Sequence, residues 1–139
     1  MKTRKYKVLI VDDEPAMRDI IATLLSLDGH LCYTAADGIE ALNRTEREYF
    51  DAVITDIVMP HMDGITLTRE LLARNPSLAV AVMTGFSNQY TADDFIALGA
   101  SDYLNKPFAI DEFSARFSEM MRDHETRRLI TESGNQSKI

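Results

Sequence analysis

Five short strand-like segments alternate with five helix-like segments along this chain of 139 residues. The strand-like segments are short runs rich in apolar residues, and the first, third and fourth of them are almost wholly apolar. Continuous apolar runs of this length are typical of strands that are covered on both faces of a parallel sheet. We expect strands at residues 8–11, 31–35, 52–55, 78–83 and 101–104.

The segments between the strands have the periodicity of amphipathic helices. Between Pro15 and Gly29, apolar residues recur at 17, 20, 21, 24 and 25, which form one stripe of a helix. Proline near a first turn and glycine after a last turn are ordinary helix ends. Similar patterns predict helices at residues 37–48, 65–75 and 91–98 and from Asp111 onward. Five strand–helix units predict an α/β fold, a doubly wound five-stranded parallel sheet with five helices.

Composition excludes several classes of protein. No apolar run approaches the about 18 residues of a membrane span, and the run after the basic N-terminus is too short for a signal peptide. We therefore expect a cytoplasmic protein without a membrane partner. The net charge of −7 argues against direct binding of nucleic acid. Cys32 is the single cysteine, so we expect a packed thiol and no intramolecular disulfide.

Residues 5–122 are long enough for one domain, and residues 123–139 form a C-terminal extension. We expect a helical extension that becomes a disordered polar tail from Thr131. The extension fits a solvated helix end, a linker to an absent output domain, or a coiled-coil contact through Met121, His124 and Leu129. We favour the linker, and we interpret His124 as a surface residue and not as a phosphorylated histidine.

Polar residues cluster at the predicted carboxyl ends of the strands, where open parallel sheets bind ligands. They are Asp12, Asp13, Asp56, Thr84 and Lys106. Three converging carboxylates repel one another, and a hard divalent cation such as Mg²⁺ relieves that repulsion. Asp56 is then a nucleophile for phosphorus, while the Thr84 hydroxyl and the Lys106 ammonium hold phosphoryl oxygens. The pattern predicts a metal-dependent site that accepts a phosphoryl group.

Each of these residues also has a simpler interpretation. Asp13 could cap the helix that follows it, Thr84 could be a turn residue before Gly85, and Lys106 could be an ordinary strand exit. The phosphoryl-accepting site is favoured because all five positions fit it together.

Longer stretches of the chain are similar to one known family, the receiver domain of two-component response regulators, related to CheY and the NtrC receiver. The resemblance covers about Tyr6 to Met121. It is carried by Val8-Leu9-Ile10-Val11-Asp12-Asp13-Glu14, Asp56-Ile57-Val58-Met59-Pro60, Met62-Asp63-Gly64, Thr84-Gly85, and Gly99-Ala100-Ser101-Asp102-Tyr103-Leu104-Asn105-Lys106-Pro107-Phe108.

The resemblance implies a flavodoxin-like (CheY-like) sheet with strand order 2-1-3-4-5. It also implies that Asp56 takes a phosphoryl group from a sensor histidine kinase or a histidine phosphotransfer protein. Mg²⁺, or Mn²⁺ as a substitute, is then held by Asp12, Asp13, Asp56 and the backbone carbonyl of Val58.

Further roles follow from the same resemblance. Thr84 and Tyr103 form a switch, Lys106 pairs with the phosphate, and the bond before Pro107 is cis. From its pattern alone, Tyr103 is more simply a core residue of a strand. Val58 and Phe86 flank the path of the attacking water in receivers, and since both are apolar we expect slow self-dephosphorylation.

The sequence contains no helix-turn-helix, no P-loop and no GGDEF-type segment, so this chain is expected to signal by protein contact. The partner is a downstream output domain or protein target, and the face that changes is formed by residues 91–98, 101–104 and the last helix. Asp102 matches a charge in OmpR-like dimers. Because Asp93 and Asp94 lack an evident basic partner, a phosphorylation-dependent homodimer of that type is doubtful.

Two rival functions belong to other classes. A haloacid-dehalogenase-type phosphatase also uses an aspartate nucleophile with Mg²⁺, but its D-x-D pattern is absent because Asp12 and Asp13 are adjacent. A flavodoxin-like nucleotide or flavin binder needs a phosphate-binding loop after the first strand, and the acidic residues there have the wrong charge. We therefore expect no enzyme beyond self-phosphorylation and self-dephosphorylation.

Overall fold

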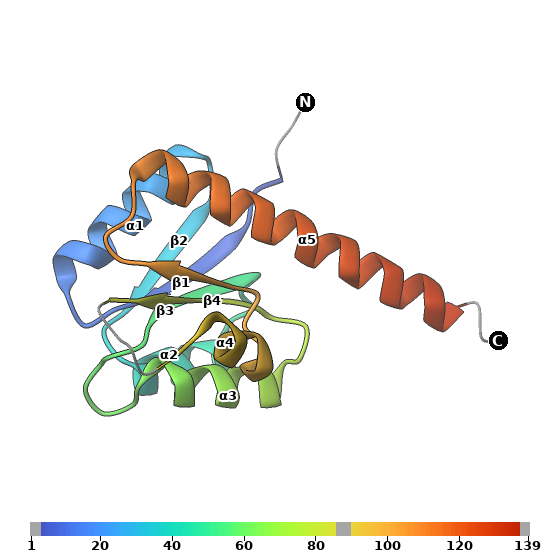
Figure 1. Ribbon diagram of the computed structural model, residues 1–139, viewed down its shortest axis with the longest axis horizontal. Coiled ribbons are helices and arrows are strands. Elements are labelled where there is room, and N and C mark those ends of the chain that lie inside the picture. Colours follow the sequence, from blue (N-terminus) through green and yellow to red (C-terminus); the bar gives the residue numbers. More distant parts are fainter. Residues whose placement is uncertain (1–3, 86–89, 137–139) are drawn as a thin grey trace.

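A five-stranded parallel sheet forms the centre of the molecule (Figure 1). The structure, a computed structural model, describes residues 4–85 and 90–136, with side chains as far as Ile130. The strand order is β2-β1-β3-β4-β5, as expected. The strands are β1 (Lys7–Val11), β2 (Leu31–Ala35), β3 (Ala52–Asp56), β4 (Ala79–Thr84) and β5 (Asp102–Asn105).

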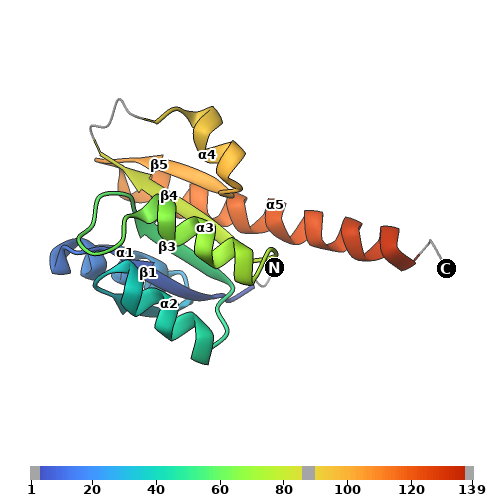
Figure 2. The same ribbon diagram turned by 90° about the horizontal axis from the view of Figure 1, so that it is seen from below.

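Helices cover both faces of this sheet. They are α1 (Pro15–Leu27), α2 (Gly38–Arg47), α3 (Gly64–Arg74), α4 (Ala92–Leu98) and α5 (Ile110–Gln136). Figure 1 shows α1 and α5 on one face and α2, α3 and α4 on the other, and Figure 2 shows the second layer from its own side. The sequence pattern predicted all five helices, with the bounds of α1 to α4 and the start of α5 within a few residues.

Each face of the sheet has its own hydrophobic core, which explains the continuous apolar runs. Side chains of a strand alternate between the faces. In β1, Val8 and Ile10 join the core under α1 and α5, while Leu9 and Val11 join the core under α2 and α3. All four side chains are fully buried. Cys32 packs partly buried against the first core, as expected, and burial raises the pKa of its thiol.

The last helix is longer than the sequence pattern predicted. The expected disordered tail from Thr131 is instead helical as far as Gln136, since a helix already formed adds residues at little cost. Phe113, Phe117 and Met121 are buried on this helix, whereas Leu129 and Ile130 are exposed. Burial of apolar side chains on this helix therefore ends at Met121, although Glu125 still pairs with Arg4 at 2.6 Å, and the end of the helix projects beyond the sheet (Figure 1). No helix among the described residues has the length and apolar character needed to cross a membrane.

A buried histidine, His30, contacts both Tyr6, the residue before β1, and Phe117 of α5. Nδ1 of His30 accepts a hydrogen bond of 3.1 Å from the backbone N–H of Tyr6, and its ring contacts Phe117 with centroids 5.1 Å apart. Burial lowers the pKa of His30, against a smaller opposing effect of Asp28. The imidazole is therefore neutral at neutral pH, with Nδ1 as an acceptor.

We expect the free energy of unfolding to fall as the pH is lowered through about 6.5, the ordinary pKa of histidine. Below that pH the unfolded state binds a proton that the native state binds only at lower pH, which gives a loss of at most about 1.4 kcal/mol per pH unit. Urea unfolding at a series of pH values measures this slope. His30→Asn should flatten it and His124→Asn should not. Equal slopes in all three proteins would contradict the assignment to His30.

Candidate functional site

Three carboxyl groups meet at the carboxyl edge of the sheet. Asp56 is the last residue of β3, and because Val11 of β1 pairs with Thr55, Asp12 follows β1 beside Asp56. Asp12, Asp13 and Asp56 each place a carboxylate oxygen within 4.8 Å of the other two. Asp12 and Asp56 are buried while Asp13 is exposed, so the acidic cluster is open to solvent on one side.

Lys106 supplies the positive charge at this cluster. Its Nζ donates hydrogen bonds of 3.1 Å to Oδ2 of Asp12 and of 3.1 Å to Oδ2 of Asp56. The backbone N–H of Lys106 donates to the carbonyl of Thr84 at 2.7 Å, and the Lys106–Pro107 bond is cis, as expected. Burial by itself lowers the pKa of Lys106, but the charges of Asp56 and Asp12 outweigh burial and raise it. The ammonium therefore stays charged at neutral pH.

Asp56 is held in place through both carboxylate oxygens. Oδ1 accepts a bond of 2.8 Å from the backbone N–H of Ile57, and Oδ2 accepts from Lys106. Burial raises the pKa of Asp56 and Asp12 adds to the rise, while Lys106 and the Ile57 N–H oppose it. One ammonium thus faces three carboxylates, and this excess of negative charge on oxygen ligands suits a hard divalent cation.

The two expected switch residues lie on neighbouring strands. Thr84 ends β4, and its buried hydroxyl donates to the carbonyl of Gly85 at 3.3 Å. Tyr103 lies half-buried in β5, where its ring stacks on Phe95 of α4 with centroids 5.5 Å apart. The carbonyl of Thr84 accepts the backbone hydrogen bond from Lys106, so Thr84 contacts the acidic site. Tyr103 instead contacts α4 through Phe95.

Of the two positions expected to set the dephosphorylation rate, the structure describes only Val58. Val58 is 76% exposed and lies in the loop that follows Asp56 at the end of β3. Phe86 lies outside the described residues.

Sequence reasoning missed one residue of the site, Arg18. Its Nη1 donates a hydrogen bond of 2.7 Å to the backbone carbonyl of Asp12. A single arginine on an amphipathic helix gives no distinctive pattern, so only its place one turn into α1 could have suggested the contact.

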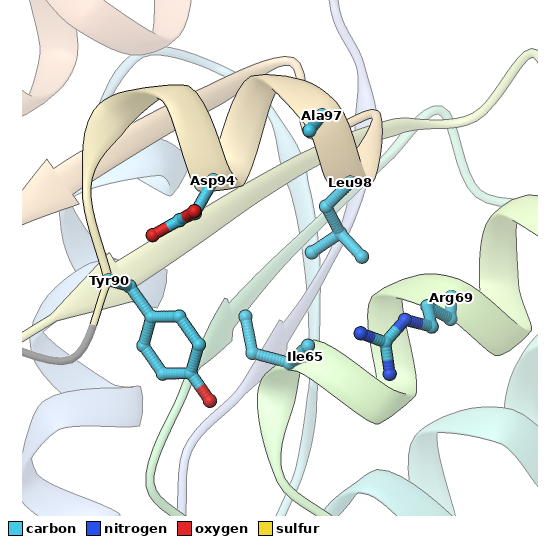
Figure 3. A pocket seen from close by; sticks show the side chains of 6 residues that line it. All are labelled: Ile65, Arg69, Tyr90, Asp94, Ala97 and Leu98. Atoms are coloured by element: carbon cyan, nitrogen blue, oxygen red, sulfur yellow. The ribbon is translucent and has the colours of Figure 1, made fainter.

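A separate cavity of about 450 Å³ lies between α3 and α4. Figure 3 shows Arg69 of α3 and Asp94 of α4 on its two sides, with Tyr90 at one end. None of its lining residues belongs to the acidic cluster. Ring contacts from Tyr90 to Phe95 and from Phe95 to Tyr103 connect its wall to the expected switch tyrosine.

Comparison with known proteins identifies the class that this fold and site define. Residues 8–118 match the model of the response regulator receiver domain, so the chain belongs to that family. Response regulator MprA of Mycobacterium leprae is 35% identical over 116 residues, which cover 84% of this chain and 51% of MprA. The chain spans about half the length of the curated relatives that it matches.

Solved structures agree with this assignment. NtrX from Brucella abortus superimposes with a TM-score of 0.86 at 30% identity, over 93% of this chain and 29% of NtrX. A CheY-like receiver domain protein from Methanospirillum hungatei has a TM-score of 0.83 at 26% identity, over 89% of this chain and 99% of that one. The chain is therefore a receiver domain of a two-component response regulator, and its acidic cluster fits the Mg²⁺ binding and phosphorylation of that family.

Proposed function

We propose that Asp56 is the phosphoacceptor of this receiver domain. The observation that carries the proposal is the double contact of its carboxylate, which lies within 4.8 Å of oxygens of Asp12 and Asp13 and is also bonded to Lys106 at 3.1 Å. The donor is a phosphohistidine on a sensor histidine kinase or a histidine phosphotransfer protein. An Asp56 oxygen forms the new bond to phosphorus as the bond from phosphorus to the histidine nitrogen breaks.

The neighbouring residues have distinct parts in this transfer. Asp12, Asp13, Asp56 and the carbonyl of Val58 would hold Mg²⁺, with Mn²⁺ as a substitute, and the bound cation supplies positive charge next to the phosphoryl oxygens. The ammonium of Lys106 pairs with another phosphoryl oxygen, and the Thr84 hydroxyl donates to a third. These groups neutralise charge and fix the approach, which is most of what phosphoryl transfer requires.

The output is a change of the face that α4, β5 and α5 form. When the Thr84 hydroxyl turns to the phosphoryl group, the ring of Tyr103 moves inward and changes its contact with Phe95 of α4. This face then controls a downstream output domain or protein target. Asp102 accepts bonds of 2.6 and 3.1 Å from Arg116 of α5 in its own chain, so an OmpR-type homodimer through Asp102 would need this pair to be exchanged.

Labelling with acetyl phosphate and Mg²⁺ tests the phosphoacceptor. Mass spectrometry should find one added phosphoryl group, which chelation of the metal prevents and Asp56→Asn abolishes. Asp63→Asn is the matched control in the same loop, because asparagine caps α3 as well as the aspartate that accepts from Thr66 N–H. Labelling that persists in Asp56→Asn would overturn the proposal.

We expect Val58→Asn to shorten the lifetime of the phosphorylated form several-fold. An amide at this exposed position can orient a water for attack on phosphorus, which valine cannot do. The decay of the mass-labelled protein after removal of the donor measures the lifetime. Val58→Ala makes the side chain smaller without adding a hydrogen-bonding group, so an equal shortening in Val58→Ala would point to access and not to orientation of the water.

A further inference from the structure

We propose that Arg18 is a positioning residue for the metal site, because it fixes the peptide that joins Asp12 to Asp13. The inference rests on the proposed function in one respect, the assignment of Mg²⁺ to these carboxylates. Arg18 lies half-buried in the first turn of α1, and its guanidinium reaches the backbone of Asp12.

Each polar group of Asp12 has its own partner. Its N–H donates to the carbonyl of Ala35 at 3.2 Å, Oδ1 accepts from the N–H of Glu14 at 2.9 Å, and Oδ2 accepts from Lys106 at 3.1 Å. Its carbonyl accepts from Nη1 of Arg18 at 2.7 Å. Since β1 ends at Val11 and Asp12 is fully buried, Arg18 supplies a bond that the sheet no longer provides. Its loss would leave a buried carbonyl without a partner.

The effect of this bond reaches Asp13 through the backbone. The carbonyl of Asp12 lies in one rigid plane with the N–H and Cα of Asp13. Among the described residues, the carboxylate of Asp13 makes no hydrogen bond or ion pair that could orient it. The direction of the exposed Asp13 carboxylate therefore depends on the peptide that Arg18 holds.

The bond from Arg18 to the Asp12 carbonyl also helps to fix the turn between β1 and α1. The N-cap residue Glu14 makes no side-chain capping bond, so the bond from its N–H to Oδ1 of Asp12 is the side-chain contact that spans the turn between β1 and α1. Arg18 adds a second tie, from the first turn of the helix back to the residue that follows the strand. Among the described residues, only one of the five N–H groups of the Arg18 guanidinium makes a hydrogen bond. The contact with the Asp12 carbonyl is therefore the main polar interaction of this side chain.

The positioning role and the charge of Arg18 predict opposite changes in Mg²⁺ affinity when Arg18 is replaced. A guanidinium near a Mg²⁺ site repels the cation, so loss of the charge by itself would strengthen Mg²⁺ binding. Loss of the hydrogen bond releases the Asp12–Asp13 peptide and weakens binding. Replacing a residue that orients metal ligands commonly costs 10–100-fold in affinity, and we expect about tenfold for Arg18→Met.

Isothermal titration calorimetry with Mg²⁺ on the full chain tests the proposal. The proteins are the wild type, Arg18→Met, Arg18→Lys and Arg122→Met, the last of which removes the same charge from an exposed position on α5. Arg18→Met should raise the Kd about tenfold, Arg18→Lys should recover part of the affinity, and Arg122→Met should match the wild type. Unchanged or tighter binding in Arg18→Met would overturn the proposal.

Two further readouts separate this proposal from the proposed function. Without metal, the backbone amide resonance of Asp13 should shift in Arg18→Met and stay in place in Arg122→Met. The slower labelling expected for Arg18→Met should return to the wild-type rate at saturating Mg²⁺. A rate that stays low at saturating Mg²⁺ would mean that Arg18 binds the phosphodonor and does not position the metal site. If the wild type fails to bind Mg²⁺, the proposed function fails. If it binds and Arg18→Met binds equally well, only the role of Arg18 fails.

Discussion

Replacing Gly64 by alanine is expected to abolish labelling of Asp56 and to lower the free energy of unfolding by about 3 kcal/mol. Gly64 begins α3, and its N–H donates to the carbonyl of Ile57 at 2.7 Å. An added Cβ would fall on the backbone carbonyl oxygen of Asp56 and within 2.9 Å of Cα of Ile57. Both neighbours are backbone, so the loop that carries the nucleophile has to shift.

Gly85→Ala is the matched control for this change. Gly85 also follows a strand at the carboxyl edge, but a Cβ built there meets nothing within 4 Å. Urea unfolding and acetyl phosphate labelling of both variants make the comparison. Gly85→Ala should resemble the wild type in both, and a Gly64→Ala protein that unfolds and labels normally would contradict the predicted clash.

Lys106→Met should lower the free energy of unfolding by about 3 kcal/mol at neutral pH without metal, because it leaves two buried carboxylates without their ammonium. The pKa of Lys106 is raised in the native state, so its stabilisation is fully present below the ordinary lysine pKa of about 10.4 and is lost only as the pH rises above that value. The loss in Lys106→Met should shrink toward acidic pH, where protonation of a carboxylate relieves the repulsion.

Unfolding in urea at neutral and mildly acidic pH, with and without Mg²⁺, measures these effects. Added Mg²⁺ should restore part of the lost stability, because a cation that binds only the native state stabilises it in proportion to the logarithm of its concentration. Lys5→Met removes an exposed lysine and serves as the control. An equal loss in both variants, or no loss in Lys106→Met, would show that Lys106 does not neutralise the cluster.

The sheet and the approximate site could be predicted from the sequence because both follow from strand patterns. Continuous apolar runs mark strands covered on both faces, and parallel pairing brings their carboxyl ends together, as it does for Asp12 and Asp56. The helical extension was harder to predict, because residues 131–136 include no apolar residue that could form a helical stripe in the sequence. The sequence of this extension does not distinguish a linker from a solvated helix end.

The contacts of Arg18 and Gly64 could not be predicted in the same way. Both depend on the path of a loop at the edge of the sheet, where a backbone carbonyl is the partner and side-chain periodicity carries no information. Tyr103 is an intermediate case. Its place in a strand was predictable, but its contact with Phe95 depends on how α4 lies over β5.

The central claim is that the phosphoryl group forms an acyl phosphate on Asp56. Reduction of the labelled protein with borohydride converts an aspartyl phosphate into homoserine, and peptide sequencing by mass spectrometry then locates it. The account predicts homoserine at position 56 alone, in samples that received both acetyl phosphate and Mg²⁺. Homoserine at another aspartate, or a label that survives reduction on a residue such as His124, would contradict it.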